Sequence, residues 1–344
     1  MKLVKLNNYT NLYIIILIYI LSCSINSYAS ERTEYKENFE KNYLYWEELA
    51  LNDDPEAQYN LGLFNFIGFD NQNDYSKAFY WFSLSADKNF TEAEYQLGIM
   101  YFHGFGIKKD ILKAVKFYLR AAKGGHKKAQ YSLGMLYFEG KGIPQNYKES
   151  YNLFLSAAKN GDPNSQNALG IIFKDGLGVT KSLVKSVSWF KLAAKQNHKQ
   201  AQFNLGLIYL DDNYSNKDII TAINWFNLSA ENGLPQAQNN LASIYYEGFG
   251  IPQDFQKATY WSKLAANNGI ALSQRRLANL YYNGWGLEKD FVLAHVWWNM
   301  AASLGDKKSI VLRDNLQKEM NDNQIAKAQE ISKKCILSKY LNCS

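Results

Sequence analysis

Residues 93–126 read AEYQLGIMYFHGFGIKKDILKAVKFYLRAAKGGH, and this stretch decides the fold. Its first, fifth and eighth residues are apolar, which is the spacing of one face of an α-helix. Gly104 and Gly106 follow, and glycine readily adopts the positive φ that ends a helix and redirects the chain. Asp110 then provides a strong N-cap for a second apolar stretch. The stretch therefore predicts two α-helices joined by a tight turn.

The same pattern recurs at a constant interval of 36 residues. Seven repeats follow one another without insertion or deletion, and they begin at Ala57, Ala93, Ala129, Ser165, Ala201, Ala237 and Ser273. We number the residues of each repeat from 1 to 36 and call its first helix A and its second helix B. Such helix pairs bury their apolar faces only by stacking on their neighbours. The sequence therefore predicts an all-α fold, an α-solenoid in which helix-turn-helix repeats form a right-handed superhelix.

Two columns of the repeats predict where each helix B begins and ends. Position 18 always holds a favoured N-cap residue: Asp74, Asp110, Asn146, Ser182, Asp218, Asp254 and Asp290. Position 33 always holds glycine or asparagine, which tolerate the left-handed conformation past a helix end: Asn89, Gly125, Gly161, Asn197, Gly233, Gly269 and Gly305. We expect the same helix B boundaries in all seven repeats.

Two further columns predict how the helices pack. Position 6 of helix A is glycine in the first five repeats, and mid-helix glycine costs up to about 1 kcal/mol relative to alanine. The close approach of a neighbouring helix is the simplest compensation. Position 25 of helix B is bulky, with small residues at positions 22 and 29, which predicts a knob packed into a hollow between helices: Trp81, Phe117, Leu153, Trp189, Trp225, Trp261 and Trp297.

The array is predicted to have helical caps at both ends. Residues 30–56 contain a stretch in helix B register, at about 36–52, that predicts an N-terminal capping helix. Residues 309–344 are expected to form C-terminal capping helices, because Lys307 to Met320 are more polar than any helix A and Asn321 to Gln324 form a capping box that opens a last helix. Repeat five departs from the pattern, because Asp211-Asp-Asn-Tyr214 replaces the two turn glycines.

The motifs Ala-x-Tyr-x-Leu-Gly, Gly-x-Gly, Asp-x-x-Lys-Ala and Trp-Phe-x-x-Ala-Ala resemble the Sel1-like repeat, a relative of the tetratricopeptide repeat. The resemblance covers residues 57–308, divided as 57–92, 93–128, 129–164, 165–200, 201–236, 237–272 and 273–308. The C-terminal extension is similar to those of exported bacterial members. The resemblance implies a protein-binding solenoid without a cofactor. By analogy with tetratricopeptide arrays, helix A is expected to line its inner groove.

A second stripe on helix A, at positions 3, 7 and 10, is therefore the candidate binding surface. It is apolar in repeats one to three and more polar in repeats six and seven. The candidate groove residues are Tyr59, Phe66, Tyr95, Phe102, Tyr131, Phe138, Asn239, Tyr246, Arg275 and Tyr282. Two interpretations stay open: these side chains pack against the preceding or following repeat, or they receive an amphipathic or extended peptide.

The first 29 residues have the features of a secretory signal peptide: Lys2 and Lys5, an apolar run over residues 13–21, and Ala29 at a small-residue cleavage site. Nine apolar residues are fewer than the ~20 that span a bilayer, so a retained membrane helix is the weaker alternative. Cys23 ends an Ile-Leu-Ser-Cys sequence that resembles a lipoprotein signal. We expect an exported protein, periplasmic, secreted or anchored through a lipid on Cys23.

The remaining chemistry of the chain is sparse. The four histidines lack metal-ligand spacing, which predicts surface or helix-end roles and no metal site. Cys335 and Cys343 are an even pair in an exported chain, which predicts a disulfide. Ser182 and Lys185 match the Ser-x-x-Lys motif of β-lactamases, an activity described for some cysteine-rich Sel1-like proteins. The repeat columns explain this match, because position 18 is a cap and position 21 is usually lysine.

The sequence thus predicts a non-enzymatic scaffold or regulator that binds a partner protein or peptide in a groove. A cell-wall or β-lactam-active hydrolase and a secreted factor that contacts host proteins are the alternatives. The 38 Lys and Arg against 32 Asp and Glu leave a diffuse charge of +6, too small to indicate nucleic acid. The oligomeric state is open.

Overall fold

The computed structural model describes residues 41–68, 73–212, 215, 217–340 and 343. All regular secondary structure in these residues is α-helical. The predicted signal segment and Cys23 lie outside the described residues. The chain divides into two compact bodies, the N-terminal body up to Gly125 and the C-terminal body from His126 onward, and each is described by itself.

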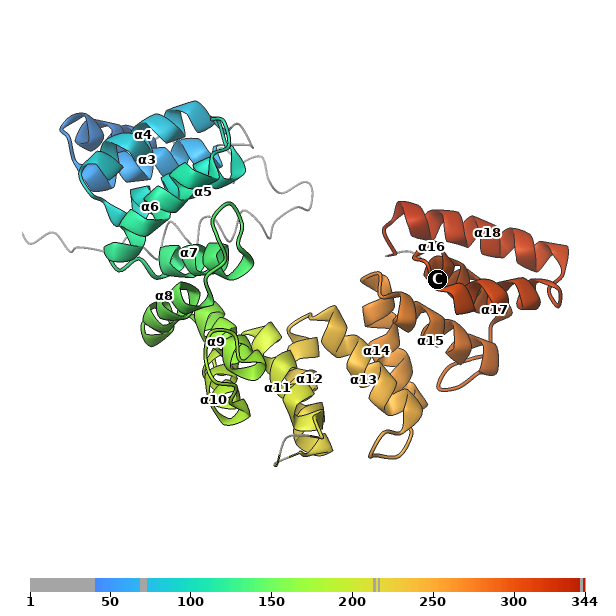
Figure 1. Cartoon of the computed structure of the whole chain (residues 1–344). Helices are drawn as coiled ribbons and strands as arrows, with labels where there is room; N and C mark the ends of the chain where they lie inside the picture. The colour runs from blue at the N-terminus through green and yellow to red at the C-terminus, as the bar shows by residue number, and fades with distance from the viewer. Residues whose placement is uncertain (1–40, 69–72, 213–214, 216, 341–342, 344) are drawn as a thin grey trace, which may run out of the picture. The chain divides into compact units, whose positions relative to one another are not determined.

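The N-terminal body contains the predicted N-terminal cap and the first two repeats (Figure 1). Residues 41–51 are helical, and Ala50 in this helix packs into one cluster with Ala57 and Leu61 of repeat one. The following helices are α3 (Pro55–Ile67), α4 (Tyr75–Asp87), α5 (Thr91–His103) and α6 (Ile111–Lys123). Within this set α3 packs against α4, α4 against α5 and α5 against α6, as expected of stacked helix pairs.

The C-terminal body contains the other five repeats and the C-terminal cap (Figure 1). Its repeat helices are α7 (Lys127–Glu139), α8 (Tyr147–Lys159), α9 (Pro163–Asp175), α10 (Leu183–Ala194), α11 (Lys199–Leu210), α12 (Ile219–Glu231), α13 (Pro235–Glu247), α14 (Phe255–Asn267), α15 (Ala271–Asn283) and α16 (Phe291–Ser303). Odd-numbered helices are helices A and even-numbered ones helices B. Consecutive helices pack together, so the chain folds as an all-α solenoid.

The predicted helix ends are confirmed. The side chains of all seven position-18 residues accept a hydrogen bond from a backbone N–H in the first turn of helix B. All seven position-33 residues have positive φ, from 59° at Asn197 to 90° at Gly305. The turn of repeat five differs as expected, because Asp211 follows α11 with an extended backbone instead of a left-handed one.

The position-6 glycines are explained by an aromatic ring of helix B. A Cβ atom on Gly98 would lie 2.4 Å from the ring of Tyr118, and one on Gly134 would lie 2.6 Å from Phe154. These rings stand at position 26, directly after the position-25 residues. The position-25 side chains pack between helices too, as Trp81 does beside Leu61, but they do not meet the glycines. Close helix approach was predicted correctly, whereas its partner at position 26 was not identified.

Repeats six and seven vary this contact. Position 6 is Ala242 in repeat six, where position 26 is the small Ser262, and Ala278 in repeat seven, where position 26 is Trp298. The Trp298 Nε1 donates to Asn279 Oδ1 at 3.1 Å. The helix pair therefore tolerates alanine at position 6 where the side chain at position 26 changes.

A column of buried glutamines at position 2 ties each repeat to the one before it. In five repeats the glutamine Nε2 donates to the backbone carbonyl at position 30 of the preceding helix B, at 3.1 to 3.3 Å: Gln58, Gln166, Gln202, Gln238 and Gln274. Repeat two has Glu94 instead. Its carboxylate pairs with Arg120 at 2.8 Å, and Arg120 itself donates to the Ala86 carbonyl at 2.8 Å.

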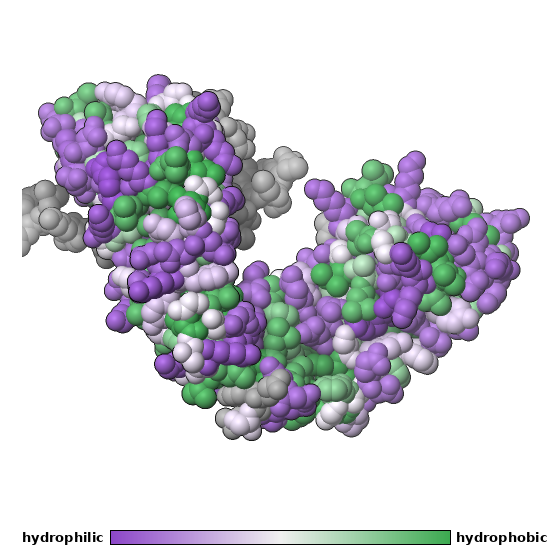
Figure 2. Space-filling model, viewed as in Figure 1, coloured by the Kyte–Doolittle hydropathy of each residue, from purple (hydrophilic) through white to green (hydrophobic). Residues whose placement is uncertain are grey.

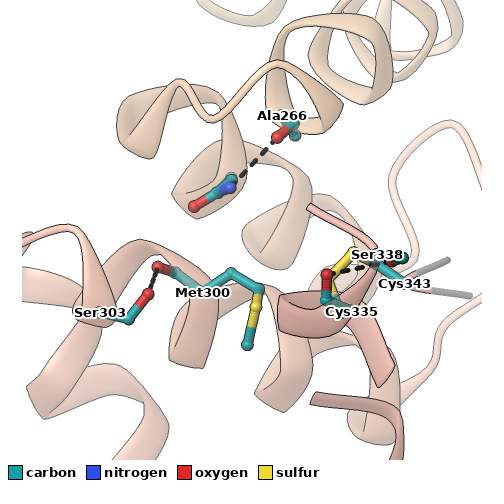
Figure 3. The surroundings of a disulfide bond; sticks show 7 residues. Ala266, Met300, Ser303, Cys335, Ser338 and Cys343 are labelled. Atoms are coloured by element: carbon teal, nitrogen blue, oxygen red, sulfur yellow. Dashed lines mark hydrogen bonds between the residues drawn. A yellow bond between two sulfur atoms is a disulfide. The ribbon is translucent and has the colours of Figure 1, made fainter. Parts of the chain in front are cut away.

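The C-terminal cap consists of α17 (Lys307–Gln317) and α18 (Asp322–Leu337), which both pack on α16. The predicted capping box is present, with Asn321 and Gln324 bonded reciprocally. Cys335 and Cys343 form the predicted disulfide, which is buried close to Met300 (Figure 3). After α18 the ring of Tyr340 lies against Gly269, so the last turn of the chain covers the loop before α15.

In the part of the chain that the structure describes, no helix combines the length and the apolar character needed to cross a bilayer.

Candidate functional site

The ten candidate groove residues are all half-buried. In the N-terminal body, Tyr59 packs with its ring centroid 5.8 Å from that of Phe82, the position-26 ring of its own repeat. Tyr95 packs in the same way on Tyr118, at 5.7 Å. The aromatic at position 3 therefore rests on helix B of its own repeat.

Position 10 packs on the turn region as well. The Phe66 ring lies 5.2 Å from Tyr75, at the start of helix B, and 5.5 Å from Phe105, in the turn of the next repeat. Phe102 lies beside His103, and the Lys109 ammonium is 5.9 Å from the Phe102 ring centroid. These contacts cover one side of each ring, and part of the ring remains exposed.

Repeat three repeats this geometry in the C-terminal body. Tyr131 lies 5.7 Å from Phe154, while Phe138 lies 5.4 Å from Tyr147. Burial raises the pKa of Tyr131, with a further contribution from the negative charge of Asp162, so its hydroxyl stays protonated at neutral pH. The stripe rings thus pack on helix B of their own repeat at position 3 and, in the case of Phe66, also on the turn of the following repeat. Partner binding by the exposed edges stays a prediction.

Repeats six and seven carry the polar end of the stripe. Tyr246 packs against Phe255 and Trp285, and Tyr282 stacks on Phe291 at 5.4 Å with Trp298 at 5.5 Å. Asn239 accepts a hydrogen bond from Ser273 Oγ at 2.8 Å. Arg275 forms an ion pair with Asp306 at 3.0 Å. The sequence predicts Arg275 as a binding residue, but its guanidinium is already paired with this carboxylate.

The sequence interpretation missed Arg276, the neighbour of Arg275. Only 6% of its surface is exposed, yet its guanidinium lies over the stripe of repeat six, with hydrogen bonds to Asn239 and Ser243 and a cation–π contact to Tyr246 at 5.9 Å. Burial lowers its pKa to about 10. A signal was present, because the other six residues at position 4 are uncharged: Asn60, Gln96, Ser132, Ala168, Asn204 and Asn240.

The histidines follow the sequence prediction with one exception. His126 and His198 are N-caps whose Nδ1 atoms each accept from a backbone N–H at 3.1 Å, and His103 is exposed beside Phe105. His295 was expected at the surface or a helix end, but it is 4% exposed within α16, close to Arg313, Asp314 and Gln317 of α17. Among the described residues, no cluster of His, Cys, Asp and Glu is arranged to hold a metal.

The Ser182 and Lys185 pair has the geometry of a helix cap. The Ser182 Oγ accepts from the backbone N–H of Lys185 at 3.3 Å. The Lys185 ammonium lies 5.4 Å from the Phe173 ring centroid, on the preceding helix. The serine hydroxyl and the lysine amine therefore have separate partners, and the match to a hydrolase motif follows from the cap column.

On the face of the C-terminal body in view, hydrophobic and hydrophilic residues alternate in small patches (Figure 2). This mixed surface suits a ligand that offers both apolar and polar groups.

Comparison with known proteins agrees with this architecture. The family model described as "Sel1 repeat" matches residues 55–90, 91–126, 127–162, 163–198, 199–234, 235–270 and 271–306, two residues upstream of our repeat boundaries. A Sel1 repeat protein from Oxalobacter formigenes is 27% identical, with a TM-score of 0.69 and 81% of each chain covered. No curated protein matches the chain.

Two further solved structures are more distant. One is c5321, a protective antigen present in uropathogenic Escherichia coli strains, with 25% identity, a TM-score of 0.41, and 87% of this chain and 79% of that chain covered. The other is the immunity protein Pa5087 from Pseudomonas aeruginosa, with 17% identity, a TM-score of 0.41, and 62% of this chain and 81% of that chain covered.

Proposed function

The chain belongs to the Sel1 repeat family, whose arrays are interaction scaffolds, and on that premise we propose that it holds a protein or peptide partner on the exposed stripe of its helices A. One observation supports this above all. In repeats one to three, the position-3 tyrosines Tyr59, Tyr95 and Tyr131 pack against a ring of helix B on one side, yet they remain half-buried instead of buried. Rings held in one orientation with an exposed edge lose little conformational entropy on binding.

We propose no catalytic role. The serine of the one hydrolase-like motif is a helix cap, and the buried histidine His295 lies close to α17 instead of on the stripe. A nitrocefin assay on the purified protein is expected to show no turnover. Turnover that Ser182→Ala abolishes would contradict this part of the proposal.

We also propose that the protein is exported, on the strength of the signal-like residues 1–29. The buried disulfide of the C-terminal cap is compatible with this, because such bonds persist in oxidising compartments. Cell fractionation would distinguish a periplasmic from a secreted or lipid-anchored protein. Recovery of the full-length chain in the cytosol would contradict export.

The binding proposal can be tested by capture from envelope fractions on the immobilised protein. The variant Phe102→Ser with Phe138→Ser removes two stripe rings. A matched control, Leu112→Ser with Val184→Ser, removes two apolar side chains from helices B, where they are 68% and 72% exposed. Circular dichroism verifies that both variants remain helical.

We expect the stripe variant to lose at least about tenfold of the captured partner, since a tenfold loss requires only about 1.4 kcal/mol and the few residues that dominate binding energy commonly cost about 2 kcal/mol or more when truncated. The control is expected to capture as much as the unmodified chain. Equal capture by the two variants would contradict the proposal, and loss of helix content in the stripe variant would show that its rings are structural. A captured host protein would favour the secreted host-interaction alternative.

A further inference from the structure

Arg276 is a buried cation without a counter-charge. It stands at position 4 of repeat seven on α15, and its Nη1 donates to Asn239 Oδ1 at 3.3 Å while its Nη2 donates to Ser243 Oγ. Both acceptors are neutral. Among the residues that the structure describes, no carboxylate forms an ion pair with Arg276. Buried charges are normally paired, because burial removes the water that stabilises them.

The acidic groups around Arg276 do not supply this charge. Asp306 is engaged by Arg275 at 3.0 Å, and it also caps α17 by accepting from the backbone N–H of Ser309 at 3.0 Å. Glu247 is exposed and favours the charged form of Arg276 only from a distance, while burial and the positive charge of Arg275 both act against it. Burial and the neighbouring Arg275 therefore disfavour the positive charge of the Arg276 guanidinium.

Beyond the two acceptors Asn239 and Ser243, the cluster contains hydrogen-bond donors of Arg276, Asn279 and Ser243. Two of the five N–H groups of Arg276 are used by Asn239 and Ser243. Asn279 lies one helical turn after Arg276, and its Oδ1 accepts from Trp298 Nε1. Among the residues that the structure describes, the amide N–H groups of Asn279 have no acceptor. The Ser243 Oγ accepts from Arg276, so its own O–H is available to donate.

The position of this cluster matches the proposed binding surface. Asn239, Ser243 and Tyr246 are positions 3, 7 and 10 of repeat six, so a peptide that lies along the stripe would pass the Arg276 guanidinium. Residues 126–344 carry 25 Lys and Arg against 17 Asp and Glu, a net charge of +8 that favours an acidic partner. One buried monovalent cation is matched by a carboxylate, whereas a phosphate would bring nearly two negative charges.

We propose that Arg276, Asn279 and Ser243 form a carboxylate-binding position that selects an acidic side chain of a peptide bound to repeats six and seven. The carboxylate would accept charge-assisted hydrogen bonds from the guanidinium, which are about twice as strong as neutral ones. This inference rests on the proposed function, because it specifies the partner chemistry of the same surface.

The test uses fluorescent octapeptide pools and the full mature chain. Four positions of each pool are randomised over apolar residues, and the other four are Glu in one pool, Gln in the second and phosphoserine in the third. Fluorescence anisotropy at low ionic strength measures binding. We expect the Glu pool to bind about tenfold or more tightly than the Gln pool, and Arg276→Gln to remove that difference.

Two further variants separate a binding role from a structural one. Lys263→Gln removes a positive charge from helix B of repeat six and is expected to keep the preference for Glu. Arg276→Met removes the buried charge but keeps a flexible apolar stem, so it is expected to raise the thermal unfolding midpoint while it loses the preference. A lower midpoint in Arg276→Met would indicate a structural role for the cation and would overturn the inference.

The remaining outcomes also decide the question. Equal binding of the Glu and Gln pools would overturn the inference while leaving peptide binding by the stripe intact. Tighter binding of the phosphoserine pool would overturn the assignment to a carboxylate. Absence of binding by all pools would overturn the inference, whereas the capture experiment on repeats two and three would still judge the proposed function independently.

Discussion

At the scale of the residue, the contact between position 6 and position 26 sets the distance between helices A and B. Glycine is a poor helix former, and it stands at position 6 in repeats one to five because no room is left for a Cβ atom beneath the ring. The ring in turn holds the stripe residue at position 3. A single small residue in the core thereby positions the side chain proposed to meet the partner.

The first prediction concerns this contact in repeat three. Gly134→Ala is expected to destabilise the chain by about 1 to 3 kcal/mol, because the new methyl group would lie 2.6 Å from Phe154. In a Phe154→Ala background the ring is absent, so the same substitution should stabilise the helix by up to about 1 kcal/mol. Urea unfolding of the four proteins measures the change of sign. A destabilising effect of equal size in both backgrounds would show that the ring is not the cause.

A second residue-scale prediction concerns His295. Burial lowers its pKa below the ordinary 6.5, and the positive charge of Arg313 adds to the effect. The unfolded chain therefore binds this proton more tightly than the folded chain does. The contribution of His295 to stability is complete above pH 6.5 and is lost as the pH falls through 6.5 toward the lower pKa of the folded state.

We therefore expect His295→Ile to reduce the loss of stability between pH 7.5 and 5.5, measured by urea unfolding at each pH. Isoleucine is chosen because Ile223 occupies the same position in repeat five. His103→Gln, which removes an exposed histidine, serves as the control. Unfolding curves of His295→Ile that shift with pH as far as those of the unmodified chain would contradict the assignment.

At the scale of the element, the glutamine column joins successive helix pairs. In repeat two the buried Glu94 and the partly exposed Arg120 replace this hydrogen bond. Burial raises the pKa of Glu94, which means that burial disfavours its charged form. The other repeats have a neutral glutamine amide at this position. The pair maintains the link to Ala86 only because Arg120 donates to that carbonyl.

This arrangement predicts a rescue. Arg120→Leu leaves the buried Glu94 carboxylate without a partner and is expected to cost about 3 kcal/mol. Adding Glu94→Gln restores the residue found at position 2 in every other repeat, and leucine stands at position 28 in four of them, so the double variant should return to within about 1 kcal/mol of the unmodified chain. Thermal and urea unfolding measure both variants. Additive losses in the double variant would contradict the proposed equivalence.

The elements also show what the sequence could predict. Helix ends depend on local rules, so the caps at position 18 and the left-handed residues at position 33 were predicted residue by residue. The partner of the position-6 glycines was not, because positions 25 and 26 are both bulky in most repeats and spacing alone does not say which one faces helix A. Arg276 and His295 were missed for a related reason: burial of a polar side chain depends on neighbours from other helices.

At the scale of the whole molecule, the side-chain chemistry of the helix A stripe differs from repeat to repeat. Each supplies one stripe of side chains, apolar in repeats one to three and more polar in repeats six and seven, on a backbone with the same helix B caps at position 18 and left-handed residues at position 33. The solenoid therefore varies its surface chemistry along the chain while the period of its helix pairs stays constant. A partner that used several repeats would be selected by the order of these surfaces.

The most direct test of the central claim is site-specific photo-crosslinking in the cells that make the protein. Benzoylphenylalanine replaces stripe residues Phe102, Tyr246 or Tyr282 in one set of variants and the exposed helix B residues Tyr80, Leu112 or Tyr260 in the other. Partner binding by helices A predicts one recurrent crosslinked product from the stripe set, and none or far less of it from the helix B set. Crosslinks confined to the helix B set, or equal in both sets, would contradict the account.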